Sequence, residues 1–227
     1  MVRTMGRTGS WMVVGLSLAA LAGCQSASAG KASGKKVVLW NGRDFTGWTR
    51  VVADPAVNVD TVWQVRDGVL WCSGKPNGYI RTQTPYADYR LHVEWRWPET
   101  PTNSGVFVHA GGPDRVWPVC IECQLKAGSA GDFVLMNGAG LTVDGADRRN
   151  PAQQFVSIKK KNPPTERYPG QWNSYDIECR GGSIRCLVNG VLQNEGTKAS
   201  PASGWICLQS EGGPIEFRNI YLEAKQD

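Results

Sequence analysis

The shortness of its apolar segments is what most constrains the fold of this chain. From Val37 onward, short runs rich in β-branched and aromatic residues are separated by Gly, Pro, Asn and Asp. No segment combines the length and the three-to-four-residue apolar repeat of an amphipathic helix. The 27 glycines and 13 prolines among 227 residues agree with many turns. This pattern predicts an all-β domain built as a sandwich or a barrel.

The expected strands either alternate in polarity or are apolar throughout. They are Thr61–Arg66, Val69–Ser73, Tyr89–Trp97, Ser104–His109, Val119–Lys126, Trp172–Arg180, Ile184–Asn189, Gly204–Gln209 and Ile215–Ala224. The region between Gly128 and Pro169 is weakly patterned, and we expect it to form long loops with one or two strands over one face of the sandwich.

The hairpin that joins Trp172–Arg180 to Ile184–Asn189 has two possible registers, which depend on the position of its turn. A turn at Gly182-Ser183 places Cys179 opposite Cys186, whereas a turn at Gly181-Gly182 offsets the two cysteines by two residues. Opposed cysteines are close enough for a disulfide. Two buried thiols explain the same pattern.

The N-terminus has the features of an export signal. Arg3 and Arg7 precede a short apolar run that ends at Leu21-Ala22-Gly23-Cys24, which resembles a bacterial lipobox. We therefore expect a lipoprotein signal peptide at residues 1–23, an acylated Cys24 with a flexible tether at 24–36, and one sandwich domain at 37–227. The expected location is the cell envelope, with the membrane reached through the lipid anchor.

The charge distribution argues against a nucleic-acid partner. The chain carries a formal net charge of +5, and five basic residues with no acid precede residue 37. The expected domain is therefore formally neutral, whereas phosphate backbones require a basic surface.

Strand alternation groups several polar residues. His92, Glu94 and Arg96 share one face of their strand, and Glu122 and Gln124 share a face of another. If consecutive strands pair, Glu94, His109, Glu122 and Gln124 form one polar row on a concave sheet face, with Arg96 and His92 close by. The solvated outer face of an antiparallel sheet produces the same alternation.

An ordered set of motifs spans most of the expected domain. It comprises Leu39–Trp48, Trp63–Leu70, Tyr89–Arg96, Asn103–His109, Glu122–Gln124, Gly170–Asn173, Val188–Gly190, Ile206–Gln209 and Glu216–Ile220. Together these motifs resemble the 3-keto-disaccharide hydrolase family. The resemblance implies a concanavalin A-like jelly-roll sandwich of two antiparallel sheets.

The resemblance also implies cleavage of glycosides that carry a ketone at sugar carbon 3. The ketone acidifies the hydrogen on carbon 2, so that elimination expels the carbon-1 substituent and water then adds back. Glu122, His109 and Glu94 are the catalytic candidates, and Gln124, Asn103 and Arg96 are the candidates for substrate binding. A divalent cation is a conceivable cofactor for the enolate, although the sequence identifies no ligand set. The alternative is a non-catalytic carbohydrate-binding lipoprotein on the same fold.

Overall fold

The structure is a computed structural model that describes residues 1–2 and 36–223. The expected signal peptide apart from Met1 and Val2, Cys24, and all of the tether except Lys36 lie outside this range. Within the described residues, no helix has the length and apolar character needed to cross a membrane.

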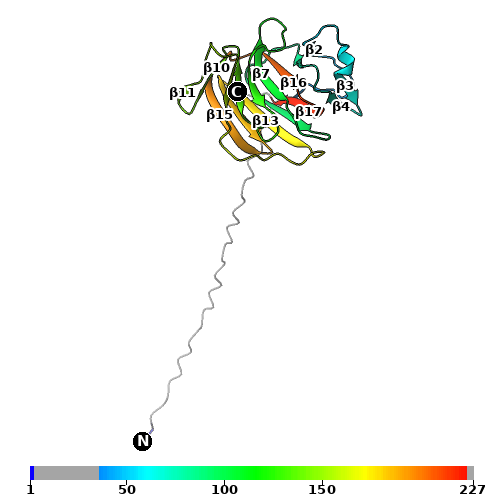
Figure 1. Ribbon diagram of the computed structural model, residues 1–227. Coiled ribbons are helices and arrows are strands. Elements are labelled where there is room, and N and C mark those ends of the chain that lie inside the picture. The colour runs from blue at the N-terminus through cyan, green and yellow to red at the C-terminus, as the bar shows by residue number, and fades with distance from the viewer. Residues whose placement is uncertain (3–35, 224–227) are drawn as a thin grey trace. The chain divides into compact units, whose positions relative to one another are not determined.

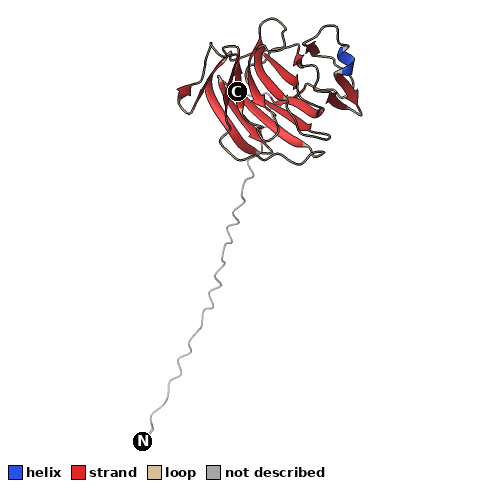
Figure 2. Ribbon diagram, in the orientation of Figure 1, coloured by secondary structure: helices blue, strands red, loops and turns tan. Residues whose placement is uncertain are grey.

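Two antiparallel sheets pack face to face (Figure 1). The ten-stranded sheet has the order β11 (Ala146–Asp147), β10 (Gly140–Val143), β15 (Val191–Ser200), β14 (Ser183–Val188), β13 (Asn173–Arg180), β6 (Tyr89–Arg96), β17 (Ile215–Glu223), β4 (Val69–Cys72) and β3 (Trp63–Arg66), with β1 (Lys36–Val38) also paired to β17. The seven-stranded sheet has the order β12 (Phe155–Ile158), β9 (Phe133–Met136), β8 (Val119–Gln124), β7 (Gly105–Gly111), β16 (Trp205–Ser210), β5 (Gly78–Thr82) and β2 (Trp48–Val52). The helical element in the described range is the 3-10 turn η1 (Val59–Thr61), as Figure 2 shows. The predicted jelly-roll sandwich is confirmed.

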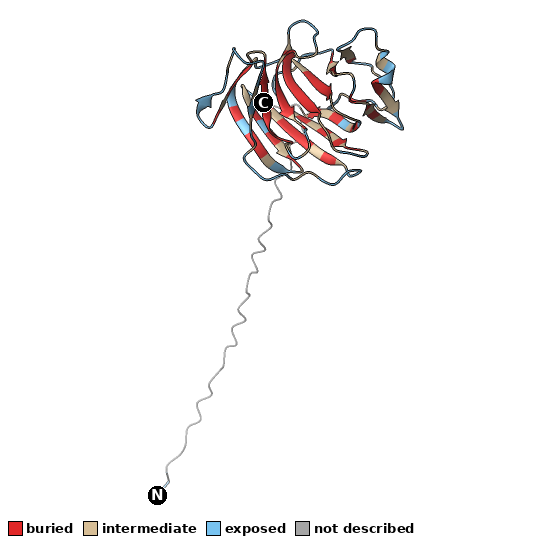
Figure 3. Cartoon of the chain, viewed as in Figure 1, coloured by how far each residue is buried: buried red, intermediate tan, exposed pale blue. Residues whose placement is uncertain are grey.

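The core forms where the inward faces of the two sheets meet. Strand β6 shows the principle, because its residues are alternately buried and partly exposed along its whole length. Figure 3 shows buried and more exposed positions along the strands of both sheets. Leu91, Val93 and Trp95 point inward and are fully buried. From the opposing sheet, Val106 and Ile121 enter the same cluster. Period-two alternation in the sequence thus becomes the division between core and surface.

The β13–β14 hairpin adopts the second of the two expected registers. Gly181 and Gly182 both have positive φ, 52° and 76°, which is the backbone of a type I′ turn. Cys179 therefore pairs with Ile184, and Cys186 with Ile177. The six cysteines in the described part of the chain are buried free thiols, so the offset pair forms no disulfide.

The region between residues 128 and 169 has more strands than the one or two expected, whereas residues 159–169 form a loop, as expected. Four strands lie there: β9 and β12 extend the seven-stranded sheet, and β10 and β11 extend the ten-stranded sheet. These strands are four residues or fewer, and Gly and Asn turns at Asn137-Gly138 and Asp144-Gly145 interrupt them. Segments this short show little periodicity in a sequence. Strands β1, β2, β5 and β15 were also not indicated by the sequence pattern.

Candidate functional site

The outer face of the seven-stranded sheet, which points away from the ten-stranded sheet, carries its own apolar cluster. Val106 and Val108 of β7 point into the main core, so Phe107 between them faces outward. Phe107 packs there with side chains from four neighbouring strands, namely Tyr79, Cys120, Val134, Met136 and Cys207. An apolar floor of this kind lowers the local dielectric for any polar group placed on it.

Glu122 of β8 lies on this floor. It pairs with Phe107, and its carboxyl group extends over Gly105, where a Cβ added to the glycine would stand 2.1 Å from Glu122 Oε1. The absence of a side chain at Gly105 thus makes room for the carboxyl. Glu122 is only 3% exposed, and its Oε1 has no hydrogen-bond partner. Burial, and after it the charge of Glu211, raises the pKa of Glu122 well above its usual 4.5.

Glu211 lies close enough to Glu122 for its charge to act on the carboxyl, and two amide side chains bond to Glu211. We call these four residues the acceptor cluster: Asn103, Glu122, Gln209 and Glu211. Gln209 Nε2 donates to Glu211 Oε2 at 2.8 Å, and the Asn103 side chain also hydrogen-bonds to Glu211. Gln209 Oε1 and Asn103 Oδ1 are buried without a partner. Burial raises the pKa of Glu211, and the two amide hydrogen bonds oppose that rise.

The acceptor cluster therefore presents buried oxygens that lack donors. An unpaired buried polar atom costs about 1–3 kcal/mol, so three in one place indicate a site shaped for a ligand. Ligand hydroxyl groups would donate to the two amide oxygens, and the protonated Glu122 carboxyl would donate to an oxygen of the ligand.

Aromatic side chains occupy the other end of the same face. Trp205 lies four residues before Gln209 on β16, about 13 Å along the strand. The Arg81 guanidinium stacks on its ring at 4.0 Å and is held by Asp114 through bonds of 2.8 and 3.0 Å. Trp117 packs against the apolar floor and meets Phe155 edge-on at 5.6 Å. Partly exposed indole rings of this kind suit stacking on a sugar ring.

The cofactor expectation finds little support in this donor set. Hard divalent cations prefer oxygen ligands, and the acceptor cluster supplies oxygens. However, no group of three or more His, Cys, Asp or Glu within residues 36–223 lies close enough to hold a metal ion. The cluster offers two carboxylates, one of which has a strongly raised pKa, so it does not fit a protein-held cation.

The sequence prediction that Glu94, His109, Glu122 and Gln124 share one face is wrong. Glu122 and Gln124 do share the outer face of β8, and Asn103 joins Glu122 in the acceptor cluster. Gln124 Oε1, however, is engaged by the backbone N–H groups of the next two residues, at 2.9 and 2.8 Å. Strands β6 and β7 belong to different sheets, because the segment between them crosses from one layer to the other. Glu94 therefore lies on the opposite side of the molecule.

His109 is also turned away from Glu122. A bulge in β7 gives His109 a φ of 55° and shifts the register between Val108 and Gly111. Its ring packs edge-on against core residue Tyr89 at 6.2 Å, and its Nδ1–H donates to the Pro201 carbonyl at 3.1 Å. Burial lowers its pKa, and the Pro201 hydrogen bond opposes that change. His109 is a neutral core residue, because the bulge reverses the parity that alternation predicts.

Glu94 and Arg96 lie in a ladder of paired charges on the outer face of the ten-stranded sheet. Arg218 Nε and Asn219 Nδ2 donate to the two Glu94 oxygens at 2.6 and 2.8 Å. Arg96 is paired with Glu216 and stacks on Trp172 at 4.6 Å. His92, beside Glu94, bonds to Asp176 at 2.8 Å. These groups satisfy one another and leave little capacity for a substrate.

Gln209, Glu211 and Gly105 are the site residues that sequence reasoning missed. Gln209 and Gly105 stand inside motifs that carried the family resemblance, but alternation alone assigned them no chemistry. Glu211 follows the end of β16, where period-two reasoning no longer applies.

Comparison with known proteins identifies the family and the fold of the chain. Residues 35–223 match the family described as 3-keto-alpha-glucoside-1,2-lyase-like domain. Among solved structures, a protein of Parabacteroides distasonis ATCC 8503 assigned as a glycosyl hydrolase is 20% identical with a TM-score of 0.61, over 84% of this chain and 94% of that one. A carbohydrate-binding module from Bacillus subtilis is 10% identical with a TM-score of 0.54, over 80% of this chain and 98% of that one. The β-glucanase of Bacillus licheniformis is 13% identical with a TM-score of 0.52, over 86% of this chain and 100% of that one.

No curated protein matches the chain. The structural likenesses are below 25% identity and establish the fold, whereas the family match covers nearly the whole sandwich. The chain belongs to the 3-keto-alpha-glucoside-1,2-lyase-like family.

Proposed function

We propose that this protein cleaves 3-keto-glycosides by elimination across carbons 1 and 2, followed by addition of water. Membership of the family supports a carbohydrate-active protein. The observation that carries the finer proposal is the buried Glu122 carboxyl beside Glu211, surrounded by oxygens that lack donors.

The reaction needs three catalytic groups: a base, a hydrogen-bond donor and an acid. A base removes the carbon-2 proton, a donor stabilises the enolate that forms on the ketone oxygen, and an acid protonates the departing oxygen of carbon 1. The C2–H and C1–O bonds break while a C1–C2 double bond forms. Water then adds across that bond and gives net hydrolysis.

The carboxyl groups of Glu122 and Glu211 fill these three catalytic roles. Because its pKa is raised well above 4.5, Glu122 holds its proton and donates a hydrogen bond to the ketone oxygen as charge develops there. Glu211 is less buried, removes the carbon-2 proton, and returns it to the leaving oxygen. Asn103 and Gln209 orient Glu211. Their partnerless side-chain oxygens accept hydrogen bonds from sugar hydroxyl groups. Trp205 and Trp117 support the remainder of the substrate.

The test uses a 3-keto-glucoside with a chromogenic leaving group. We expect release of the chromophore, reduced by about 100-fold or more in both Glu122→Gln and Glu211→Gln. Glu94→Gln is the matched control, since it neutralises a carboxylate on the other sheet and is expected to change the rate by less than about twofold. Equal rates in Glu122→Gln and Glu94→Gln would contradict the assignment.

A carbohydrate-binding module without catalysis is the second candidate. The aromatic end of the face favours it, since Trp205 and Trp117 provide stacking surfaces that need no reacting group. Saturable sugar binding that persists in Glu122→Gln, with no chromophore release by the wild type, would support this alternative.

We also propose that the protein is an exported lipoprotein of the cell envelope, anchored through Cys24. The support is the lipobox-like Leu21–Cys24 sequence after a short basic and apolar segment. Cys24→Ser should move the protein from the membrane fraction to the soluble fraction on cell fractionation. A variant that stays with the membranes would exclude this anchor.

A further inference from the structure

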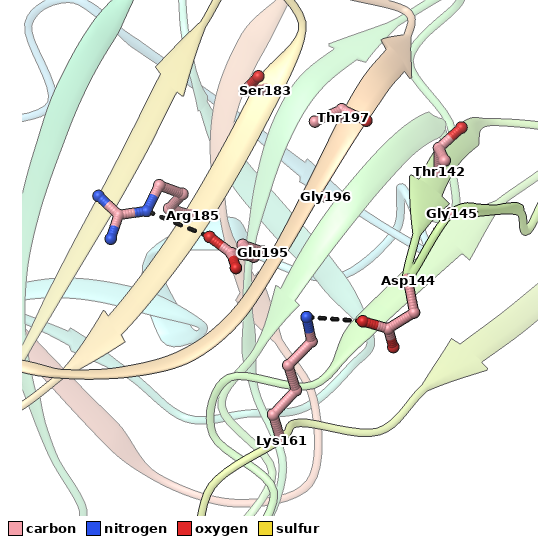
Figure 4. Close-up of a pocket in the computed structure, with 9 residues that line it drawn as sticks. All are labelled: Thr142, Asp144, Gly145, Lys161, Ser183, Arg185, Glu195, Gly196 and Thr197. Atoms are coloured by element: carbon pink, nitrogen blue, oxygen red, sulfur yellow. Dashed lines mark ion pairs between the residues drawn. The ribbon is translucent and has the colours of Figure 1, made fainter.

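We propose a second carbohydrate-binding site, on the outer face of the ten-stranded sheet, for a neutral polyhydroxylated ligand. A pocket of about 390 Å³ lies there, lined by residues of β10, β14 and β15, by the turn after β10, and by Lys161. Its volume falls within the range typical of small-ligand pockets, about 300–1,000 Å³. Figure 4 shows two ion pairs among the lining residues, one between Lys161 and Asp144 and one between Arg185 and Glu195.

Backbone structure fixes the walls of this pocket. Asp144 and Gly145 form a tight turn with φ of 53° and 76°, which closes the β10–β11 hairpin. Lys161 comes from a distant loop, and its backbone N–H donates to the Gln193 carbonyl at 2.7 Å. Its ammonium group reaches Asp144 at 2.8 Å (Figure 4). One side of the pocket is therefore tied together by an ion pair between two separate segments.

The other side is formed by the two neighbouring strands β14 and β15. Arg185 bonds to Glu178 at 2.7 Å and approaches Glu195 at 3.5 Å. Since Arg185 is mainly engaged by Glu178, the Glu195 carboxylate keeps acceptor capacity for a ligand. Strands β10, β14 and β15 add the hydroxyl groups of Thr142, Ser183 and Thr197.

The composition of the lining selects the ligand class. Lys161 pairs with Asp144, and Arg185 is shared by Glu178 and Glu195, so these groups include one carboxylate more than cations and disfavour an anionic ligand. Carboxylates accept hydrogen bonds, ammonium and guanidinium groups donate them, and hydroxyl groups do both. Vicinal hydroxyl groups of a neutral sugar match this mixture. The lining contains no aromatic ring, so we expect weaker binding than at a stacking site.

This site is independent of the proposed reaction, since the acceptor cluster lies on the other sheet. A second site of this kind would hold a glycan on the protein surface without chemical change. Holding a glycan in this way is compatible both with an enzyme and with a protein that only binds carbohydrate.

The experiment measures laminaritriose binding by NMR titration of the protein, because laminaritriose carries no ketone and is therefore not a substrate of the proposed reaction. We expect saturable shifts of the Gly145 and Gly196 amides that Glu195→Gln weakens by about tenfold. Glu178→Gln is the matched control, because it removes another Arg185 partner that does not line the pocket, and it should alter binding by less than about twofold.

Three outcomes would overturn the proposal: no shift of these amides at any sugar concentration, equal binding by Glu195→Gln and Glu178→Gln, or stronger binding of a uronic-acid trisaccharide than of laminaritriose. Failure of the proposed reaction would leave the amide shifts unaffected, so the two ideas are tested separately.

Discussion

Two regions on the outer faces of the two sheets, one around Glu94 and one around Glu122, use polar residues in opposite ways. On the ten-stranded sheet, Glu94 is bonded by Arg218 and Asn219, and its neighbour His92 is bonded by Asp176. On the seven-stranded sheet, Glu122 lies over a glycine with a buried, partnerless oxygen.

The difference shows how to separate a structural charge from a functional one when both lie on polar strand faces. Charges of the first kind are satisfied by neighbours in the free protein, and removing one costs stability. Charges of the second kind are costly in the free protein and find their partners in a ligand. Sequence alternation cannot distinguish the two, because both produce the same polar stripe.

The largest effect on activity is expected from a substitution that fills the space above Gly105. Gly105→Ala places a methyl group where the Glu122 carboxyl lies, with only 2.1 Å to Oε1, so the carboxyl must move. We expect chromophore release to fall by about 100-fold, since misplacement by an ångström can cost that much. Gly111→Ala on the same strand is the control, because a Cβ there meets nothing within 4 Å. A fully active Gly105→Ala protein would remove the special position of Glu122.

The pH dependence of stability should differ between the two faces. The raised pKa of Glu122 means that its contribution to stability is fully present below its unfolded value near 4.5 and is lost as the pH rises through its folded value. Burial by itself would raise the pKa of Glu94, but the Asn219 and Arg218 hydrogen bonds outweigh it and lower the pKa. Its contribution is present above the unfolded value and is lost as the pH falls through the folded value.

Urea unfolding at a series of pH values measures this contrast. Glu122→Gln should flatten the fall in unfolding free energy toward higher pH by up to about 1.4 kcal/mol per pH unit. Glu94→Gln should flatten only the acid limb. Identical pH profiles for the two variants would mean that the faces do not differ as described.

The effect of His109 should be on stability alone. His109→Gln removes a buried ring that packs on Tyr89 and donates to Pro201, so we expect the free energy of unfolding to fall by about 1–2 kcal/mol. Chromophore release by the folded variant should stay within about threefold of the wild type. A loss of turnover as large as that of Glu122→Gln would show that His109 takes part in catalysis.

The smallest effect is expected at Glu94. The Glu94 side chain is 20% exposed and that of its partner Arg218 is 41% exposed, so solvent screens their attraction. Glu94→Gln should lower the free energy of unfolding by about 0.5–1 kcal/mol, measured by thermal or urea unfolding. A cost of several kcal/mol would show that this ladder is more than a set of surface pairs.

The sequence predicted side-chain faces well and strand neighbours poorly. The inward set Leu91, Val93 and Trp95 and the outward set His92 and Glu94 follow from local alternation, and both are confirmed. The pairing of Tyr89–Trp97 with Ser104–His109 failed, because a short connection in a sandwich can cross between layers as easily as it can turn back within one.

Two further parts of the site needed the structure. The bulge that turns His109 inward depends on the positive φ of His109 itself, and neither Val108 nor Ala110 is a glycine that would indicate such a bend. The contact of Glu122 with Gly105 and its proximity to Glu211 join residues that are distant in sequence, and local patterns carry no information about them. Strand alternation and the family resemblance both selected Glu122, and the resemblance alone selected Asn103. Gln209 and Glu211 emerged only when β16 was placed next to β7.

The six buried thiols make the protein its own reporter of internal opening. Burial raises the pKa of Cys72 and of Cys179 to about 12, so neither forms appreciable thiolate at neutral pH while the core is closed. Cys72, Cys179 and Cys186 belong to one sheet, and Cys120, Cys123 and Cys207 belong to the other. The rate at which each is alkylated in native buffer therefore records how often its layer is exposed to solvent. Equal rates would mean that the layers separate in one cooperative event, and unequal rates would identify the layer that opens first.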